Sequence, residues 1–250
     1  MAKLEGKVAI VTGSGQGIGR GMAIALAKEG AKVVIAEINP ETGKAVAEEI
    51  RKLGKQAINV QFDLAVQDSV RHMVDVAVKE FGPIDILINN GQTLFGDPAM
   101  VEEFPEERWD RTYQTGIKGT WYCCKAVFPY MKERGGSIIN FASGVGIYGW
   151  EGWSDYAGCK EAIRGFSKTA AKEWAKYKIR INIICPGIVS PSYLAALAKY
   201  PEKFTATAAS MGDPERDAGR LAVFLASSDS ELLTGHTFHV EKDKVTVQYP

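Results

Sequence analysis

Short apolar runs alternate along the chain with longer stretches in which apolar residues recur every three or four positions. The runs are rich in β-branched residues and are predicted strands, at residues 8–11, 33–35, 57–62, 84–88, 137–141 and 179–184. The stretches between them predict amphipathic helices, with apolar stripes such as Trp109, Tyr113, Ile117, Trp121, Cys124, Phe128 and Met131. Because strands and helices alternate, the pattern predicts an α/β fold with a doubly wound, Rossmann-like parallel sheet and helices on both faces.

The alternation continues without a linker, a charge run or an internal repeat, so residues 1–250 are predicted to form a single domain. A segment rich in Ser, Pro, Ala and Lys, residues 190–213, follows the last of the six strands. That position is typical of a lid over a ligand, although a pair of plain surface helices would give the same pattern. Residues 242–250 are predicted to be a short C-terminal tail.

Composition limits the range of partners. The chain has 30 Lys and Arg residues and 30 Asp and Glu residues, so its net charge is zero. It therefore has no basic excess with which to bind nucleic acid or an anionic membrane. A small molecule is therefore the expected substrate. The apolar run before Thr12 is too short for a signal peptide, and no stretch is apolar enough for a membrane span. The four cysteines show no pairing pattern, which favours reduced thiols and a cytoplasmic location.

A glycine-rich loop, Gly13-Ser14-Gly15-Gln16-Gly17-Ile18-Gly19, joins the first predicted strand to the helix that follows it. Residues without a Cβ allow a tight turn and let backbone N–H groups approach a pyrophosphate at a helix N-terminus. Glycine loops are common, but this one lies between a strand and a helix, as in dinucleotide-binding proteins. Gly13, Gly17, Ile18 and Gly19 are the predicted cofactor contacts, and a turn without a ligand is the alternative.

Glu37 lies at the end of the second predicted strand, eighteen residues beyond Gly19. A carboxylate near this distance binds the hydroxyl groups of the adenosine ribose in NAD-binding folds and repels a 2′-phosphate. Glu37 therefore favours NAD over NADP. Arg20, in the first helical turn, is the one nearby group that would offset this charge, and a solvated acid at the strand end is the alternative reading of Glu37.

Tyr156 and Lys160 are spaced four residues apart, which places both on one face of a helix. A lysine ammonium about 4 Å from a phenolate stabilises the anion by roughly 4 kcal/mol at an effective dielectric constant of 20, so a lower tyrosine pKa is expected. Ser143 follows a predicted strand, where its hydroxyl could hold a substrate oxygen toward the phenol. An isolated Tyr-x-x-x-Lys pair is common by chance, so the argument depends on the combination.

These motifs together resemble the short-chain dehydrogenase/reductase family, in its branch of single-domain proteins of about 250 residues. The resemblance covers almost the whole chain and rests on Thr12-Gly13-x-x-x-Gly17-x-Gly19, Asp63-Leu64, Asn89-Asn90-Gly91, Ser143…Tyr156-x-x-x-Lys160 and Asn182…Pro186-Gly187. It implies about seven strands and a catalytic role for Ser143, Tyr156 and Lys160. The cofactor contacts it implies are Asp63, Leu64, Asn90, Tyr156, Lys160, Pro186, Gly187 and Val189.

The implied reaction is reversible hydride transfer between a nicotinamide and a secondary alcohol or its ketone. Aromatic residues between Ser143 and Tyr156 suggest a cyclic, aromatic or polyol substrate. The predicted substrate contacts are Gln92, Ser143, Tyr148, Trp150, Trp153 and Tyr156, with the acid Asp155 beside them. Packing against a neighbouring subunit is the alternative use of the aromatic rings.

The resemblance also implies a homotetramer or homodimer that pairs through the helices carrying residues 109–131 and 156–177. No metal site is expected, because His72, His236 and His239 lack the spacing of metal ligands. The charged residues of 102–111 are predicted to be a solvated helix start.

The chain departs from the family pattern at Gln92, Gly116, Pro191 and the segment Glu241-Lys242-Asp243. Gly116 matters most, because it stands where the family has a helix-borne catalytic Asn. Either water fills the space, or the side chain of Gln92 or Gln114 reaches into it. A catalytically weak dinucleotide-binding scaffold or redox sensor is therefore the alternative to an enzyme.

Overall fold

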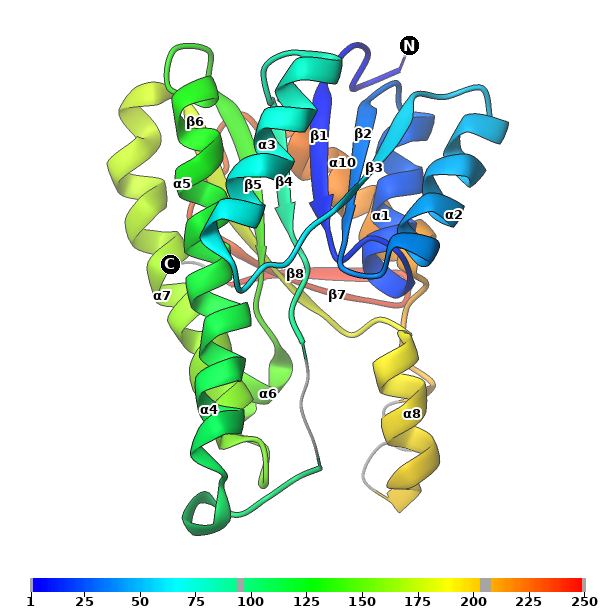
Figure 1. The fold of residues 1–250 in the computed structure, drawn as a ribbon. Helices are drawn as coiled ribbons and strands as arrows, with labels where there is room; N and C mark the ends of the chain where they lie inside the picture. The colour runs from blue at the N-terminus through cyan, green and yellow to red at the C-terminus, as the bar shows by residue number, and fades with distance from the viewer. Residues whose placement is uncertain (1, 94–96, 203–207, 249–250) are drawn as a thin grey trace.

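The computed structural model describes residues 2–93, 97–202 and 208–248, drawn as a coloured ribbon in Figure 1. Within these residues the strands form one eight-stranded sheet in the order β3-β2-β1-β4-β5-β6-β7-β8. Their bounds are β1 Val8–Thr12, β2 Lys32–Glu37, β3 Ala57–Gln61, β4 Ile86–Asn89, β5 Gly136–Phe141, β6 Ile179–Pro186, β7 Thr237–Glu241 and β8 Lys244–Gln248. All neighbours are parallel except β7 and β8, so the predicted doubly wound fold is confirmed.

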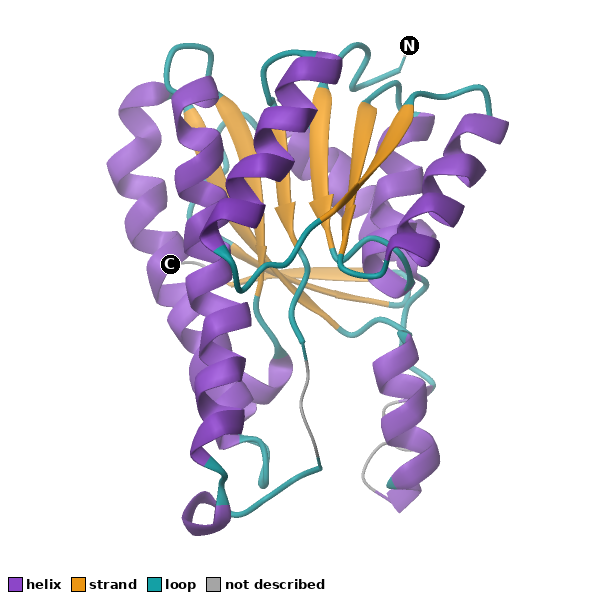
Figure 2. Cartoon of the chain, in the orientation of Figure 1, coloured by secondary structure: helices purple, strands orange, loops and turns teal. Residues whose placement is uncertain are grey.

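Helices cover both faces of the sheet, as Figure 2 shows. Their bounds are α1 Gly17–Lys28, α2 Pro40–Lys52, α3 Gln67–Phe81, α4 Glu106–Tyr113, α5 Gly119–Met131, α6 Gly144–Tyr148, α7 Ser154–Trp174, α8 Pro191–Lys199 and α10 Arg220–Ala226. Two buried apolar clusters lie on opposite faces of the sheet, one holding residues of α1, α2 and α10 and the other residues of α3, α5 and α7.

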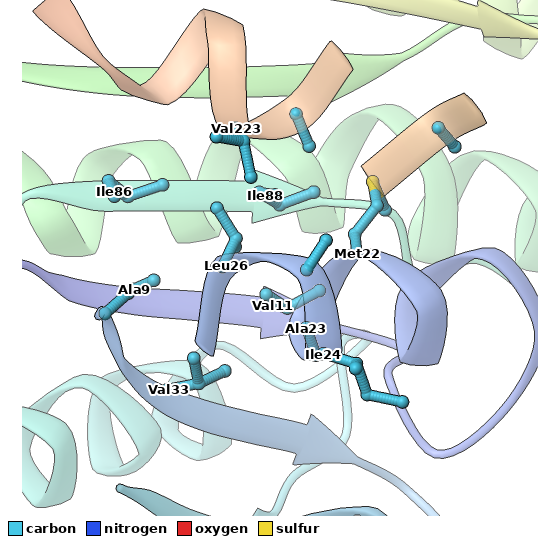
Figure 3. Close-up of a cluster of buried hydrophobic side chains, with 14 of the residues drawn as sticks. Ala9, Val11, Met22, Ala23, Ile24, Leu26, Val33, Ile86, Ile88 and Val223 are labelled. Carbon is cyan, nitrogen blue, oxygen red and sulfur yellow. The ribbon is translucent and has the colours of Figure 1, made fainter. Parts of the chain in front are cut away.

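Alternation along β1 explains how one strand serves both clusters. Ala9 and Val11 belong to the cluster with α1, whereas Val8 and Ile10 belong to the cluster with α3 and α5. Successive side chains of a strand point to opposite faces, so a strand covered on both sides must be apolar throughout. Figure 3 shows the first cluster, in which Leu26 of α1 packs over the sheet.

The eighth strand corrects the predicted strand count and the predicted tail. Residues 242–250 are not simply a tail, because β8 pairs antiparallel with β7 across a turn at Lys242 and Asp243, where Asp243 has a φ of 54°. A hairpin needs such a turn, and the alternating pattern of Lys244–Gln248 was a strand signal that the motif-based reading passed over. The strand is short and exposed, so apolar continuity could not reveal it.

The apolar stripe from Trp109 to Met131 is not one regular helix. A π-helical turn over Gln114–Lys118 separates α4 from α5. Trp109 and Trp121, two members of the stripe, are 39% and 41% exposed. The turn shifts the helical register, and such turns often occur at functional sites.

The predicted lid segment contains α8, none of whose residues is buried, and its part at 203–207 lies outside the described residues. No helix in the described part of the chain has the length and apolar character needed to cross a membrane. The four cysteines are free and buried.

Candidate active site

The predicted catalytic side chains meet at the carboxyl end of β5. Ser143 caps the N-terminus of α6, where its Oγ accepts a hydrogen bond from the backbone N–H of Val145 at 3.2 Å. The Tyr156 side chain lies close enough to Ser143 for the serine hydroxyl to affect its protonation. Lys160 follows one turn along α7, and its Nζ donates to the carbonyl oxygen of Phe141 at 3.1 Å and lies 5.4 Å from the centroid of the Tyr156 ring. The structure thus brings all three together.

Burial controls the protonation of this group. It raises the pKa of Tyr156 above its ordinary value, while the hydrogen bond from Ser143 acts in the opposite direction. It also lowers the pKa of Lys160 to about 8. Removal from water disfavours the charged form of both groups, which opposes the expected stabilisation of a phenolate by the lysine. The expected lower tyrosine pKa is therefore wrong for the protein without ligand.

A cavity of about 360 Å³ opens beside Ser143 and Tyr156. Tyr148, Trp150 and Trp153 line it, as the aromatic pattern predicted. Other lining residues were not predicted, and they come from the end of β6 and the loop after it, from α8, from the segment before Pro214 and from β7: Cys185, Ile188, Tyr193, Ala196, Ser210, Met211, His239 and Glu241. For Tyr193, Ala196, Ser210 and Met211 the sequence signal was the position of residues 190–213 after the last of the six predicted strands.

The glycine loop is shaped for close approach of backbone to a ligand. Gly13 and Gly17 have φ values of 61° and 55°, which favour glycine. A Cβ on Gly19 would lie 2.3 Å from the carbonyl oxygen of Gly13. The first turn of α1 has no side-chain cap at Gln16, so its N–H groups can bind a phosphate.

Glu37 closes this loop from the end of β2. It is 9% exposed, and its Oε2 accepts from the N–H of Gly15 at 2.9 Å while Oε1 accepts from the N–H of Ile38 at 3.0 Å. Arg20, the group that would favour a 2′-phosphate, donates instead to Glu49 of α2 at 2.9 Å. The Glu37 carboxylate therefore lies beside the glycine loop, whereas the Arg20 side chain is paired with Glu49.

The remaining predicted cofactor contacts border the same edge of the sheet. Asn90 fixes the loop, because its Nδ2 donates to the carbonyls of Thr12 and Gly13, both at 3.0 Å. Asp63 accepts from the N–H of Ala65 at 2.9 Å, and Leu64 packs so closely on α5 that a Cβ on Gly119 would lie 2.5 Å from its Cγ.

The loop after β6 completes this edge. Ile18, Pro186 and Gly187 line the cavity, and the N–H of Val189 donates to the carbonyl of Gly212 at 2.9 Å. Together with the space that glycines leave free, these residues fit a dinucleotide whose phosphates lie at the N-terminus of α1.

Gln92 lies apart from the predicted substrate contacts. It is not among the described residues that line the cavity, and its Nε2 donates to the carbonyl of Thr112 at 3.4 Å and to Sγ of Cys159 at 3.6 Å. A Cβ on Gly116 would lie 2.1 Å from Sγ of Cys159 and 2.9 Å from Nε2 of Gln92. Two side chains therefore occupy the space beside Gly116. Gln114 turns away and donates to the carbonyl of Ala65 at 2.6 Å.

Comparison with known proteins agrees with this geometry. The sequence profile described as short chain dehydrogenase matches residues 7–201. The chain is 37% identical to a 12α-hydroxysteroid dehydrogenase of Clostridium sp., over 96% of this chain and 97% of that protein. It is 34% identical to the 3-oxoacyl-(acyl-carrier-protein) reductase FabG of Thermotoga maritima, over 96% and 98% of the two chains, and 33% identical to FabG of Staphylococcus aureus, over 94% and 96%.

Both kinds of relative are named for the oxidation of a hydroxyl group or the reduction of a ketone. The profile match covers more than half of the chain, and the relatives are matched over nearly their whole length. With the Ser143, Tyr156 and Lys160 side chains assembled beside a dinucleotide-shaped loop, the chain belongs to the short-chain dehydrogenase family of oxidoreductases.

Proposed function

We propose that this protein is an NAD-preferring oxidoreductase that interconverts a ring-bearing secondary alcohol and its ketone. The observation that carries the proposal is the position of Ser143 and Tyr156 in the wall of a cavity that is otherwise lined largely by aromatic and apolar side chains. Such a cavity suits a substrate with a flat apolar body and one reactive oxygen.

The chain's own residues supply the proton chemistry. Because burial keeps Tyr156 protonated at neutral pH, its phenol can donate a proton to the oxygen of a ketone. The Ser143 hydroxyl can hold that same oxygen, since Ser143 and Tyr156 line the same cavity. Lys160 supplies positive charge within 5.4 Å of the ring centroid, which favours the phenolate left behind. In the direction of alcohol oxidation the same groups act in reverse.

A bound nicotinamide would exchange a hydride with the substrate carbon that bears this oxygen. Gly13, Gly17 and Gly19 would leave room for the pyrophosphate, and Glu37 would accept hydrogen bonds from the adenosine ribose. The preference for NAD rests on Glu37, which repels a 2′-phosphate, and on Arg20, which is paired with Glu49.

The substrate class follows from Tyr148, Trp150 and Trp153 in the cavity wall. Flat apolar rings stack on aromatic faces, and sugar rings do so as well, so polyols stay among the candidates. A relative named as a hydroxysteroid dehydrogenase supports a rigid cyclic alcohol. We further propose a cytoplasmic homotetramer or homodimer, for which the exposed Trp109 and Trp121 on α4 and α5 offer apolar contact area.

The test measures the absorbance of the reduced nicotinamide while the protein is supplied with secondary alcohols and ketones, cyclic, aromatic, polyol and short linear, and with NAD or NADP in turn. We expect turnover of a cyclic or aromatic compound and tighter binding of NADH than of NADPH. Tyr156→Phe should lower turnover by about 10²- to 10⁴-fold while leaving NADH affinity within twofold, because it removes the proton and no phosphate contact.

Three results would contradict the proposal. NADH binding without turnover of any compound would favour the catalytically weak scaffold. Tighter binding of NADPH would show that Glu37 does not decide the cofactor. Activity of Tyr156→Phe within a few-fold of the parent would remove Tyr156 from the reaction.

A further inference from the structure

A buried ion pair lies next to the catalytic tyrosine but outside the catalytic group. Nε of Arg108 lies 3.1 Å from Oδ2 of Asp155, and the two side chains are 9% and 2% exposed. The hydroxyl of Thr112 donates to the same Oδ2 at 2.9 Å. The sequence pattern placed Arg108 in a solvated helix start and Asp155 at the border of the substrate. The other charged residues of 102–111 are exposed as expected, but Arg108 is not. Asp155 is not among the described residues that line the cavity, and it binds Arg108 in the interior.

The guanidinium of Arg108 joins several segments at once. It donates a hydrogen bond to the backbone carbonyl of Asp97, and it lies 4.3 Å from the ring centroid of Phe104 and 5.7 Å from that of Trp153. One side chain of α4 therefore touches the loop after β4, the residue that precedes α7, and the first turn of α7. A planar guanidinium with five fixed donors can make these contacts together, whereas a lysine ammonium cannot.

The energetics of a buried ion pair indicate that it holds segments in place more than it stabilises the fold. Removing two charges from water is unfavourable, and a buried pair regains the loss only when further hydrogen bonds satisfy both groups. Both groups have such bonds, because the Thr112 hydroxyl donates to Asp155 and the carbonyl of Asp97 accepts from Arg108. Buried pairs of this kind add little net stability, but they fix the relative position of the segments they join.

The segment fixed here is the aromatic wall of the cavity. Trp153 directly precedes α7 and lines the cavity, with its ring centroid 6.5 Å from that of Tyr156 in an edge-on arrangement. Asp155 lies between these two residues in the sequence. Gly152, with a φ of 83°, accepts a hydrogen bond at its carbonyl from the N–H of Ala99 at 3.1 Å, so the loop after β4 is tied to the same turn.

We propose that Arg108 is a positioning residue that holds Trp153 in the cavity wall through its contacts with Asp155, and so determines which ring-bearing substrates fit. The inference rests on the proposed function for the identity of the substrate. The placement of Trp153 by Arg108 is a separate physical claim that needs no turnover to test.

The first experiment follows Trp153 directly, by acrylamide quenching of tryptophan fluorescence. Parent and Arg108→Gln are each measured with and without Trp153→Phe, and the difference isolates the Trp153 signal. We expect at least twofold stronger quenching of that signal in Arg108→Gln. Arg71→Gln, which breaks the exposed pair between Arg71 and Asp68, is the matched control and should leave the signal unchanged. If Arg108→Gln does not fold, Arg108→Lys is used, and we expect the same direction of change.

The second experiment compares steady-state constants for a ring-bearing alcohol and for a short linear alcohol. In the Arg108 variant that folds, KM for the ring-bearing alcohol should rise at least tenfold with kcat within threefold, and KM for the linear alcohol should stay within threefold. A merely structural role would lower the folded fraction and reduce activity toward both alcohols equally. Parent-like quenching of Trp153 in a folded Arg108 variant, or equal losses for both alcohols, would overturn the proposal. Absence of turnover in the parent would contradict the proposed function alone, since the quenching result would still stand.

Discussion

At the scale of single residues, depth of burial decides how the catalytic group is charged. The spacing of Tyr156 and Lys160 was visible in the sequence, and the structure places both on one face of α7. Their pKa values shift in the directions that loss of water dictates, upward for the phenol and downward for the ammonium. A spacing motif reports which groups meet but does not report how much solvent surrounds them.

Lys160 gives a prediction on stability. Its pKa of about 8 in the folded protein lies below the ordinary value of 10.5, so between these pH values the unfolded chain binds a proton that the folded chain does not. The free energy of unfolding of the parent therefore rises with pH between about 8 and 10.5. At pH 7 the folded parent is destabilised, because the charged ammonium of Lys160 is buried. We expect Lys160→Met to be more stable than the parent at pH 7 by about 2 to 3 kcal/mol, with the advantage shrinking toward pH 10.5.

Denaturant unfolding of both proteins at pH 7 and at pH 9.5 checks this, and Lys44→Met, at an exposed lysine, serves as the control. Activity of Lys160→Met should be lost at both pH values. An equal stability difference at the two pH values would show that the ammonium is not the source of the cost.

At the scale of elements, the π-helical turn between α4 and α5 packs against distant parts of the chain. Gly116 lies in this turn, and Sγ of Cys159 from α7 fills the place where its side chain would be. Gln92 brings its amide to the same point. The sequence left open whether water or an amide side chain, that of Gln92 or Gln114, fills this space. The position of Gln92 confirms the amide alternative, while the contact of Cys159 with Gly116 was not predicted.

This contact predicts an unusual response to a helix-favouring substitution. Gly116→Ala should gain about 1 kcal/mol from helix propensity, but its Cβ would lie 2.1 Å from Sγ of Cys159, and overpacking costs about 1 to 3 kcal/mol. We expect a net destabilisation in denaturant unfolding. Cys159→Ala removes the sulfur, so adding it to Gly116→Ala should restore much of the stability, and the double-mutant cycle should show strong coupling. Additive effects would mean that the two positions do not compete for this space.

An element can be predicted from the sequence when its own residues determine it, and not when it depends on residues far along the chain. The six apolar runs correspond to β1 to β6, because a strand buried on both faces must be apolar. The exposed β8 lacks that requirement. Ser143, Tyr156 and Lys160 followed from motif and spacing, whereas the Arg108–Asp155 pair joins residues 47 positions apart and left no pattern in either segment.

At the scale of the whole molecule, the site lies where the order of the strands reverses. β1 pairs with β2 on one side and with β4 on the other, so the loops that follow β1 and β4 diverge to opposite sides of the sheet. A crevice forms at such a point in doubly wound folds, and ligands bind there. The hydrogen bonds from Asn90 to Thr12 and Gly13 join these two loops at the crevice. The order of the strands thus brings residues from all parts of the chain to one edge.

An exposed ion pair joins α8 to the loop after β4. Nζ of Lys199, at the end of α8, lies 2.5 Å from Oδ1 of Asp97 in the loop after β4. Both side chains are more than half exposed, at 57% and 61%. The hydrogen bond from Lys199 lowers the pKa of Asp97, which favours the charged carboxylate at neutral pH. None of the residues of α8 is buried, and this pair is a polar contact that ties the end of the helix to another segment.

Neutralising the pair should therefore loosen α8 without disturbing the fold. We expect Asp97→Asn to speed hydrogen exchange of the amides at residues 194–199 by about two- to fivefold, measured by mass spectrometry at pH 7 and low salt, with exchange in α7 unchanged. High salt should erase the difference, because it screens exposed charges in the parent. Glu41→Gln, which removes an exposed pair with Lys44 in α2, is the matched control and should leave α8 unaffected. Exchange in α8 that is equal in Asp97→Asn and the parent at low salt would show that the helix is held by its other contacts.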